Sequence, residues 1–463
     1  MPQPVTSESR AEQMLNEPVN RVIPRLAVPT IISMLITAVY NMSDTYFVSR
    51  ISTEASAAVG VVFSAMSIIQ AFAFTIGIGS GANMSRALGA KKEKEAETFV
   101  SVAFFTAFTA GLILMVLANS HLESLVRFLG ATGEIVPHAE AYATYIFYAA
   151  PFMMCSFVMN NLLRFQGLAA FAMIGITSGG ILNMILDPIF IFGLKLGTAG
   201  AAIATGISQC VSFSILLGMC NLRKETISVT RKNFRPSISI YGRIFYNGMP
   251  SFGRQGIASA ATILLNRVAG GISPDSATVS ATIATMSIVN RFVLFINSAV
   301  IGFGQGFQPV CAFCWGARRI RRVREAFWFC VKVSTFILFV LAGVSFGFAR
   351  TIICFFRAED PLVVEIGTRA LRLQLLTLPL WGFYTMTNMC TQSIGFGGQA
   401  LLVSCARQGI FLIPALLILP QTLGILGLQL SQPAADLCAF LFSAVVMSSV
   451  LRKMWEAEER NLG

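Results

Sequence analysis

The chain has 463 residues, of which 55% are hydrophobic and only 12% are charged. This composition leaves too little polar surface to cover a water-soluble globule, so the solvent that fits the chain is a lipid bilayer. The net charge of +12 does not indicate nucleic-acid binding, because the basic residues gather in short loops between apolar runs. We therefore expect an integral membrane protein that does not bind nucleic acid.

The beginning of the chain is polar. Residues 1–23 contain acids and prolines and lack the apolar stretch of a cleavable signal peptide. We expect this segment to stay in the cytoplasm.

The rest of the chain carries recurring apolar runs of about 20 residues, the length that a helix needs to cross the hydrocarbon layer. We predict an all-α integral membrane protein with about twelve transmembrane helices. They are expected near residues 24–48, 55–84, 99–118, 138–162, 170–192, 198–220, 245–269, 277–309, 327–349, 363–390, 401–419 and 427–451.

A polar, basic stretch divides these helices into two sets of six. We predict an N-lobe at residues 24–220, a cytoplasmic linker at 221–241, a C-lobe at 242–451 and a cytoplasmic tail at 452–463. Basic clusters near residues 86–94, 223–235, 318–324 and 452–453 would all fall on one side of the membrane. That distribution follows the positive-inside rule and places both termini in the cytoplasm.

The two halves share residue patterns. Gly77-x-Gly79-x-Gly81 recurs as Gly302-x-Gly304-x-Gly306, Pro29 recurs as Pro250, and Gly197 recurs as Gly424. Such internal repeats are typical of transporters. Because each half crosses the membrane an even number of times, the lobes should be related by an axis along the membrane normal, with a substrate cavity between them.

Two acids lie inside the predicted N-lobe spans, where an ionised group is costly unless it is paired or hydrated. Asp44 and Asp187 are expected at the same depth, near the outer ends of the first and fifth helices. Tyr40 and Asn183 each precede one acid by four residues and share its helix face.

Thr205 on the sixth helix returns to about that depth, and Pro188 removes a backbone donor beside Asp187. We interpret Asp44, Asn183, Asp187 and Thr205 as a site for a proton or a sodium ion. Two close carboxylates in a low dielectric favour protonation of at least one of them. The alternative is that these acids lie in a wet vestibule or at misjudged helix ends.

The C-lobe spans contain arginines where the N-lobe has acids. Arg254 lies near the start of its helix and has two interpretations, a functional one and a snorkelling one. Arg291 is deeper and requires a partner, for which Asp436 is the candidate. We expect this lobe to contribute shape and hydrophobic contact rather than ion coupling.

No arrangement of nucleophile and base is visible, so we do not predict an enzyme and we expect no cofactor. The two GxGxG runs lack the strand before and the acid after that a dinucleotide site requires. Small residues of this kind commonly pack membrane helices together.

Several motifs resemble the multidrug and toxic compound extrusion (MATE) family over nearly the whole chain. They are Leu182-Asn-Met-Ile-Leu-Asp-Pro-Ile-Phe190, Gly197-Thr-Ala-Gly-Ala-Ala202, Gly302 to Pro309 and Asn160-Asn-Leu-Leu-Arg-Phe-Gln-Gly167. The run from Tyr40 to Asp44 resembles the DinF/MepA-like branch rather than the NorM branch. The resemblance implies two six-helix lobes in a V and antiport of cationic or amphipathic drugs against protons or sodium.

The resemblance also implies that Tyr40, Tyr142 and Asn160 lie near the ion-coupling residues. Tyr40, Tyr142, Asn160, Arg254, Gln255 and Arg291 are our candidates for the substrate cavity. Arg254 and Gln255 stand where the NorM branch has an acid, so a sodium site in the C-lobe is not expected. We expect a monomer in the inner membrane of a prokaryote.

Two alternatives remain open. A lipid or oligosaccharide flippase of the same superfamily would show a more cationic cavity. A non-transporting membrane receptor is disfavoured, because it has no need of matched repeats with buried acids.

Overall fold

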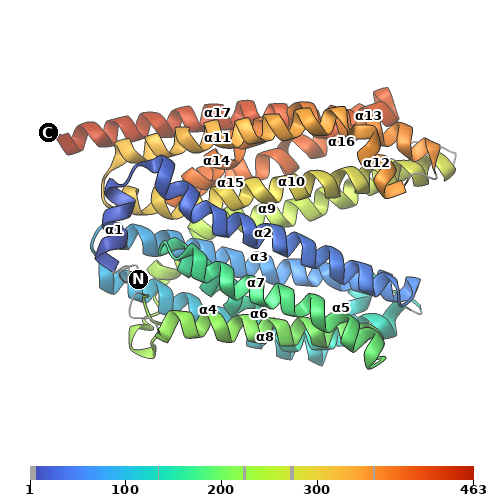
Figure 1. Cartoon of the computed structure of the whole chain (residues 1–463), viewed down its shortest axis with the longest axis horizontal. Helices are drawn as coiled ribbons and strands as arrows, with labels where there is room; N and C mark the ends of the chain where they lie inside the picture. The colour runs from blue at the N-terminus through green and yellow to red at the C-terminus, as the bar shows by residue number, and fades with distance from the viewer. Residues whose placement is uncertain (1–6, 134, 223–225, 272–275, 358–359, 463) are drawn as a thin grey trace.

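The protein is a bundle of long helices, shown in Figure 1. The computed structural model describes residues 7–133, 135–222, 226–271, 276–357 and 360–462. The first half contains α1 (Ser7–Asn16), α2 (Val19–Ser49), α3 (Thr53–Gly89), α4 (Glu93–Ser120), α5 (Leu122–Phe128), α6 (Ile135–Phe165), α7 (Ala169–Pro188) and α8 (Gly197–Leu222).

The second half contains α9 (Ile238–Gly271), α10 (Ser276–Gly316), α11 (Ile320–Gly347), α12 (Ala349–Arg357), α13 (Pro361–Thr377), α14 (Leu380–Ile394), α15 (Gly397–Cys405), α16 (Leu412–Leu423) and α17 (Ile425–Leu462). Two π-helical turns interrupt the series, Ile189–Gly193 after α7 and Ala406–Phe411 between α15 and α16.

The all-helical fold class is confirmed. Within the described residues, ten helical segments are long and apolar enough to cross a bilayer. The two other predicted spans correspond to α9 and to the pair α13 and α14. The latter pair is one span interrupted at Pro379, because proline lacks the N–H that a continuous helix needs.

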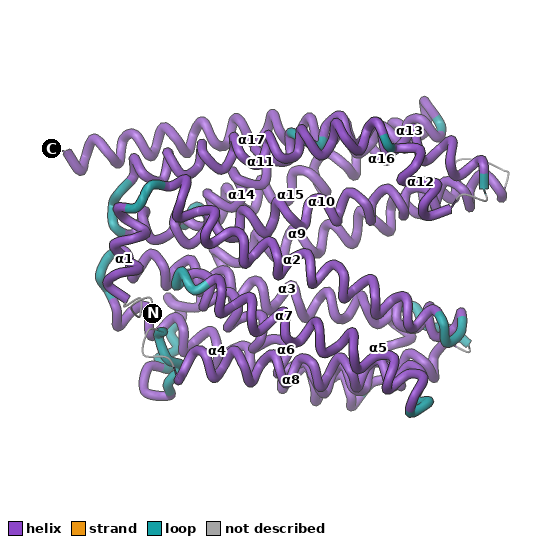
Figure 2. The backbone as a smooth tube through the Cα atoms, in the orientation of Figure 1, coloured by secondary structure: helices purple, strands orange, loops and turns teal. Residues whose placement is uncertain are grey.

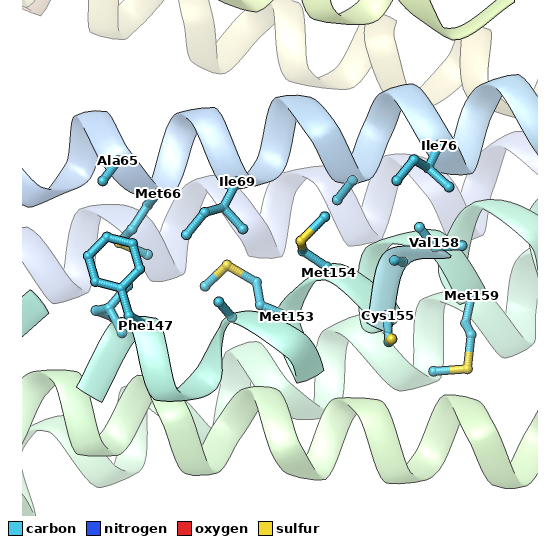
Figure 3. Close-up of a cluster of buried hydrophobic side chains, with 14 of the residues drawn as sticks. Ala65, Met66, Ile69, Ile76, Phe147, Met153, Met154, Cys155, Val158 and Met159 are labelled. Carbon is cyan, nitrogen blue, oxygen red and sulfur yellow. The ribbon is translucent and has the colours of Figure 1, made fainter. Parts of the chain in front are cut away.

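Each lobe has its own hydrophobic core. Figure 3 shows part of the N-lobe core, where Ile69 and Ile76 of α3 lie over Met153 and Val158 of α6. The C-lobe core is built mainly from α10, α11, α13, α14 and α17, but it also takes in residues from the start of α2, including Ile23. Helix α2 therefore contributes residues to the hydrophobic cores of both lobes.

The lobes are joined by two close helix contacts, of α2 with α10 and of α3 with α9. A Cβ at Gly302 of α10 would lie 2.6 Å from Cα of Ile31 in α2. In the repeated position, a Cβ at Gly79 of α3 would collide with the carbonyl oxygen of Ile244 in α9. The GxGxG runs are thus packing positions, because only glycine lets these backbones approach so closely.

The two lobes repeat the same turns. Lys91 after α3 and Arg318 after α10 both adopt a left-handed backbone with φ 57°. The amide of Asn160 donates to the carbonyl of Ala172 at 2.9 Å, and the amide of Asn388 donates to the carbonyl of Ala400 at 2.8 Å. Both bonds span twelve residues. This conformational repeat agrees with the predicted sequence repeat.

The lobes meet at one end of the molecule and diverge at the other, as Figures 1 and 2 show. The closed end carries both termini and the short helix α1. There Arg322 of α11 donates to the carbonyl of Met14 at 2.8 Å, and a Cβ at Gly167 would collide with the Met14 side chain. Helix α1 therefore contacts both lobes at this end.

The close packing of α3 on α9 gives a stability prediction. Gly79→Ala should destabilise the protein by about 1–3 kcal/mol, because the added methyl group forces the Ile244 backbone away. Gly60→Ala on the same helix is the matched control, since nothing lies within 4 Å of a Cβ there. The thermal unfolding temperature in detergent should fall for the first variant only. Equal temperatures for both variants would contradict this packing.

Candidate functional site: buried acids of the N-lobe

Helices α7 and α8 bring three of the predicted ion-site residues together. The Asn183 amide nitrogen donates to Asp187 Oδ1 and to Thr205 Oγ1, each at 3.2 Å. Asp187 is completely buried, and Asn183 and Thr205 are 2% and 4% exposed. A buried carboxylate with one neutral amide as its donor is far from satisfied, because an ionised oxygen normally accepts several hydrogen bonds.

Asp44 faces the same site from α2. It is half-buried, and it lies near enough to Asp187 for the two carboxylates to repel each other. Tyr40, one turn earlier on α2, is within range of both acids. A Cβ at Gly180 of α7 would meet the Tyr40 ring at 3.7 Å, so α2 and α7 are in direct contact beside the acids.

Three oxygens of this site are buried and have no hydrogen-bond partner within the described residues. They are Asp44 Oδ1, Asn183 Oδ1 and Asp187 Oδ2. Leaving such acceptors unpaired is costly, so the arrangement favours a proton on a carboxyl group or a hard cation between the oxygens. Carboxylate, amide and hydroxyl oxygens together make a chemically suitable set for either species.

The backbone changes its geometry directly after Asp187. Helix α7 ends at Pro188, and a π-helical turn follows at Ile189–Gly193. Proline cannot donate the next helical hydrogen bond, and π turns are frequent at functional positions of helices. The sequence signal for this departure was the Asp-Pro pair.

Tyr142 and Asn160 have different surroundings. Tyr142 is 1% exposed; its hydroxyl donates to Met66 Sδ at 3.9 Å and also interacts with Thr205. It therefore lies at the acid site. Asn160 instead donates to the Ala172 carbonyl of α7, which gives it a structural role in joining α6 to α7.

The charged residues of the C-lobe are arranged differently from our expectation. Arg407 donates from Nε to Asp436 Oδ1 at 2.6 Å, and its guanidinium lies 3.5 Å from the centre of the Trp381 ring. The Asp436 side chain is completely buried and also accepts from Gln432 at 2.9 Å and from Thr377 at 3.2 Å. The proposed pairing of Arg291 with Asp436 was wrong, because Arg407 neutralises that acid and Arg291 is exposed on α10.

Arg254 and Gln255 of α9 are both half-buried. Arg254 makes no ion pair within the described part of the chain, and it lies close to Tyr384 of α14. Arg254 is also near enough to Arg164 for the two charges to repel. Gln255 has no side-chain hydrogen bond among the described contacts; only its carbonyl is engaged, by Ser259 at 3.2 Å.

Sequence reasoning missed Arg164. This arginine of α6 is 1% exposed, and it donates to Asn161 at 2.7 Å and across the lobes to Gln308 at 3.4 Å. No carboxylate pairs with it within the described residues. The available signal was its position four residues after Asn160, as the only arginine or lysine in the sequence of α6.

Known proteins match this chain over most of its length. The sequence model of the MatE family matches residues 29–189 and 250–417. The multidrug export protein MepA of Staphylococcus haemolyticus is 26% identical over 430 residues, covering 92% of this chain and 93% of that protein. MepA of Staphylococcus aureus strain MRSA252 is 27% identical over 436 residues, covering 93% and 94%.

Solved structures of transporters also match this chain over nearly its whole length. One describes the outward-facing conformation of a multidrug resistance MATE family transporter of the MOP superfamily; it matches with a TM-score of 0.89 and 26% identity, covering 97% of this chain and 99% of that one. A MOP superfamily transporter from Pyrococcus furiosus, described as having a binding pocket of reverse polarity, matches with a TM-score of 0.88 and 26% identity over the same shares. The chain belongs to the MatE family and is a multi-pass membrane transporter of the MepA-like branch.

Proposed function

We propose that this protein is a secondary active antiporter that exports cationic or amphipathic small molecules in exchange for protons or sodium. One observation carries the proposal. Two acids, an amide and a hydroxyl converge in the N-lobe, and three of their buried oxygens have no partner among the described residues. An ion that enters the site satisfies these oxygens, and a gradient of that ion is the energy source for export.

The exchange follows from charge. A proton or sodium ion at Asp44 and Asp187 removes negative charge from the site, which weakens its attraction for a cationic drug. Occupancy by one species therefore biases the protein toward the state that releases the other. The π-helical turn that follows α7, at Ile189–Gly193, is the element best placed to change shape as the charge of the site changes.

The shape of the molecule is consistent with alternating access. The lobes diverge at the end of the molecule opposite the basic turns. The positive-inside rule places the basic turns in the cytoplasm, so the end at which the lobes diverge faces away from the cytoplasm. In this assignment both termini are cytoplasmic and the protein acts as a monomer in a bacterial cell membrane. The two Staphylococcus relatives, both named as multidrug export proteins, support this direction of transport.

Reconstituted proteoliposomes test the proposal. We expect an imposed proton or sodium gradient to drive uptake of a fluorescent cationic dye into vesicles that contain inverted protein. Dissipating the gradient with an ionophore should abolish uptake. Dye movement that is independent of both gradients would contradict antiport.

A second candidate is a flippase for an anionic lipid or a lipid-linked saccharide. Arg164 and Arg254 favour it, because both lie where the lobes meet and neither pairs with a carboxylate in the described residues. The same vesicles separate the two functions. Gradient-driven movement of a cationic dye supports the antiporter, whereas movement of a fluorescent anionic phospholipid between leaflets supports the flippase.

A further inference from the structure

A cavity lies at the closed end of the molecule, where the two lobes meet, and it is separate from the acid site. Its volume is about 750 Å³, within the usual range of small-molecule pockets. Its charged lining residues are Arg86, Lys92 and Glu95 from the N-lobe and Arg243 and Arg318 from the C-lobe. Both lobes therefore contribute to its wall.

The polar part of this wall is strongly basic. Four of the lining side chains are cations, and Glu95 is the acid that faces them. Arg243 binds Glu95 at 2.5 Å, and Lys92 approaches the same carboxylate at 3.9 Å. Since one carboxylate serves two cations, positive charge is left over.

Arg86 and Arg318 hold that remaining charge. Arg86 donates to the neutral Asn83 at 2.6 Å, and neither arginine forms an ion pair in the part of the chain that the structure describes. Arg86 also lies close enough to Arg243 for the two guanidinium groups to repel each other, and the attraction of Arg86 to Glu95 is weaker than this repulsion. Like charges held together in this way favour an anion between them.

The backbone around the cavity holds these cations in position. Arg318 follows α10 in a left-handed conformation, with φ 57°. The Arg243 guanidinium lies 4.8 Å from the centre of the Phe99 ring, and the Asn83 amide donates to the Arg243 carbonyl at 3.1 Å. The basic groups are thus carried by α3, α9 and the turns after α3 and α10, rather than by a single exposed segment.

Part of the wall is apolar. Trp315, Ile320 and Ile394 line it, and the Trp315 ring packs edge-on against Phe396 with centroids 5.9 Å apart. A small inorganic anion gains nothing from contact with this apolar surface, whereas the hydrocarbon part of an amphiphile packs against the surface. The combination of arginines with an apolar wall at a membrane surface suits a phosphate diester that carries acyl chains.

We propose that this cavity binds the phosphate group of an anionic phospholipid. Arg86 and Arg318 contact the phosphate, and the wall formed by Trp315, Ile320 and Ile394 contacts the apolar part of the lipid. Because both lobes line the cavity, a bound lipid stabilises the arrangement in which this end is closed. The assignment does not depend on the transported substrate or on the coupling ion.

Lipid titration of the full-length protein in detergent tests the proposal. Binding is followed by native mass spectrometry and by the thermal unfolding temperature. Phosphatidylglycerol should bind and raise that temperature, phosphatidylcholine should not, and millimolar inorganic phosphate should compete. The double variant Arg86→Gln, Arg318→Gln should lose at least about tenfold in affinity for phosphatidylglycerol, because charge-assisted bonds are lost.

The matched control removes two positive charges outside the cavity. Arg321 and Arg452 are 79% and 84% exposed, and both are absent from its wall, so Arg321→Gln, Arg452→Gln should bind phosphatidylglycerol as the unmodified protein does. Should Arg86→Gln prevent folding, Lys92→Gln, Arg318→Gln changes only exposed side chains. Equal losses in the cavity and control variants would overturn the proposal, as would equal binding of the two lipids. Saturation by inorganic phosphate with no gain from phosphatidylglycerol would overturn the lipid assignment.

Discussion

Replacing Asp187 by asparagine is expected to abolish ion-coupled export while the protein still folds and inserts. Asparagine has almost the same volume and can still accept the hydrogen bond from Asn183, but it cannot ionise. Loss of the contact with the coupling ion should lower the rate of coupled transport by at least about 10- to 100-fold. Gradient-driven drug transport in proteoliposomes measures the effect, and Asp44→Asn should behave in the same way.

The control for these variants is Glu123→Gln, the same change of acid to amide on the exposed helix α5. It should transport normally. Drug binding gives an independent measurement: affinity should fall as the pH falls or as sodium rises, because either ion neutralises the acids, and Asp44→Asn should flatten this dependence. Full coupled transport by both site variants would refute the assignment of the acids.

Replacing Asp436 is expected to have a large effect on the stability of the protein. Asp436→Asn leaves the Arg407 guanidinium, which is 11% exposed, buried without its counter-charge. Removing one partner of a buried ion pair costs about 3–5 kcal/mol. The variant should therefore unfold at a clearly lower temperature than the unmodified protein.

The paired change separates this role from ion coupling. Asp436→Asn combined with Arg407→Gln removes both charges, so it should recover most of the lost stability. The recovered protein should keep the ion dependence of the unmodified transporter. If Asp436→Asn folded normally and lost its response to protons and sodium, the coupling site would lie in the C-lobe instead.

The sequence predicted the membrane-embedded parts of the helices better than their ends. Hydropathy marks only residues that lie in hydrocarbon, so the predicted span at 427–451 captures the apolar part of α17. That helix continues to Leu462 through charged residues that belong in water. Helix α1 was missed for the same reason, because it is short and polar.

The N-lobe acids were predictable because depth can be counted along a helix. Asn183 and Asp187 lie four residues apart, and this spacing alone places them on one face. The ion pair of Arg407 with Asp436 joins residues 29 positions apart on different helices. Such a contact depends on how the helices rotate against one another, which counting along the chain does not provide. The predicted pairing of Asp436 with Arg291 was wrong because the sequence does not give this rotation.

The glycine contacts between α3 and α9 determine how the two lobes can part. The carbonyls of Thr75 and Ile244 that face Gly248 and Gly79 keep their own helical hydrogen bonds when the surfaces separate. Dispersion forces hold such surfaces together, and a gap of about 0.5–1 Å already loses about a quarter to a half of this attraction while gaining no new contacts. The contact between α3 and α9 should therefore favour the fully closed arrangement over any slightly separated one.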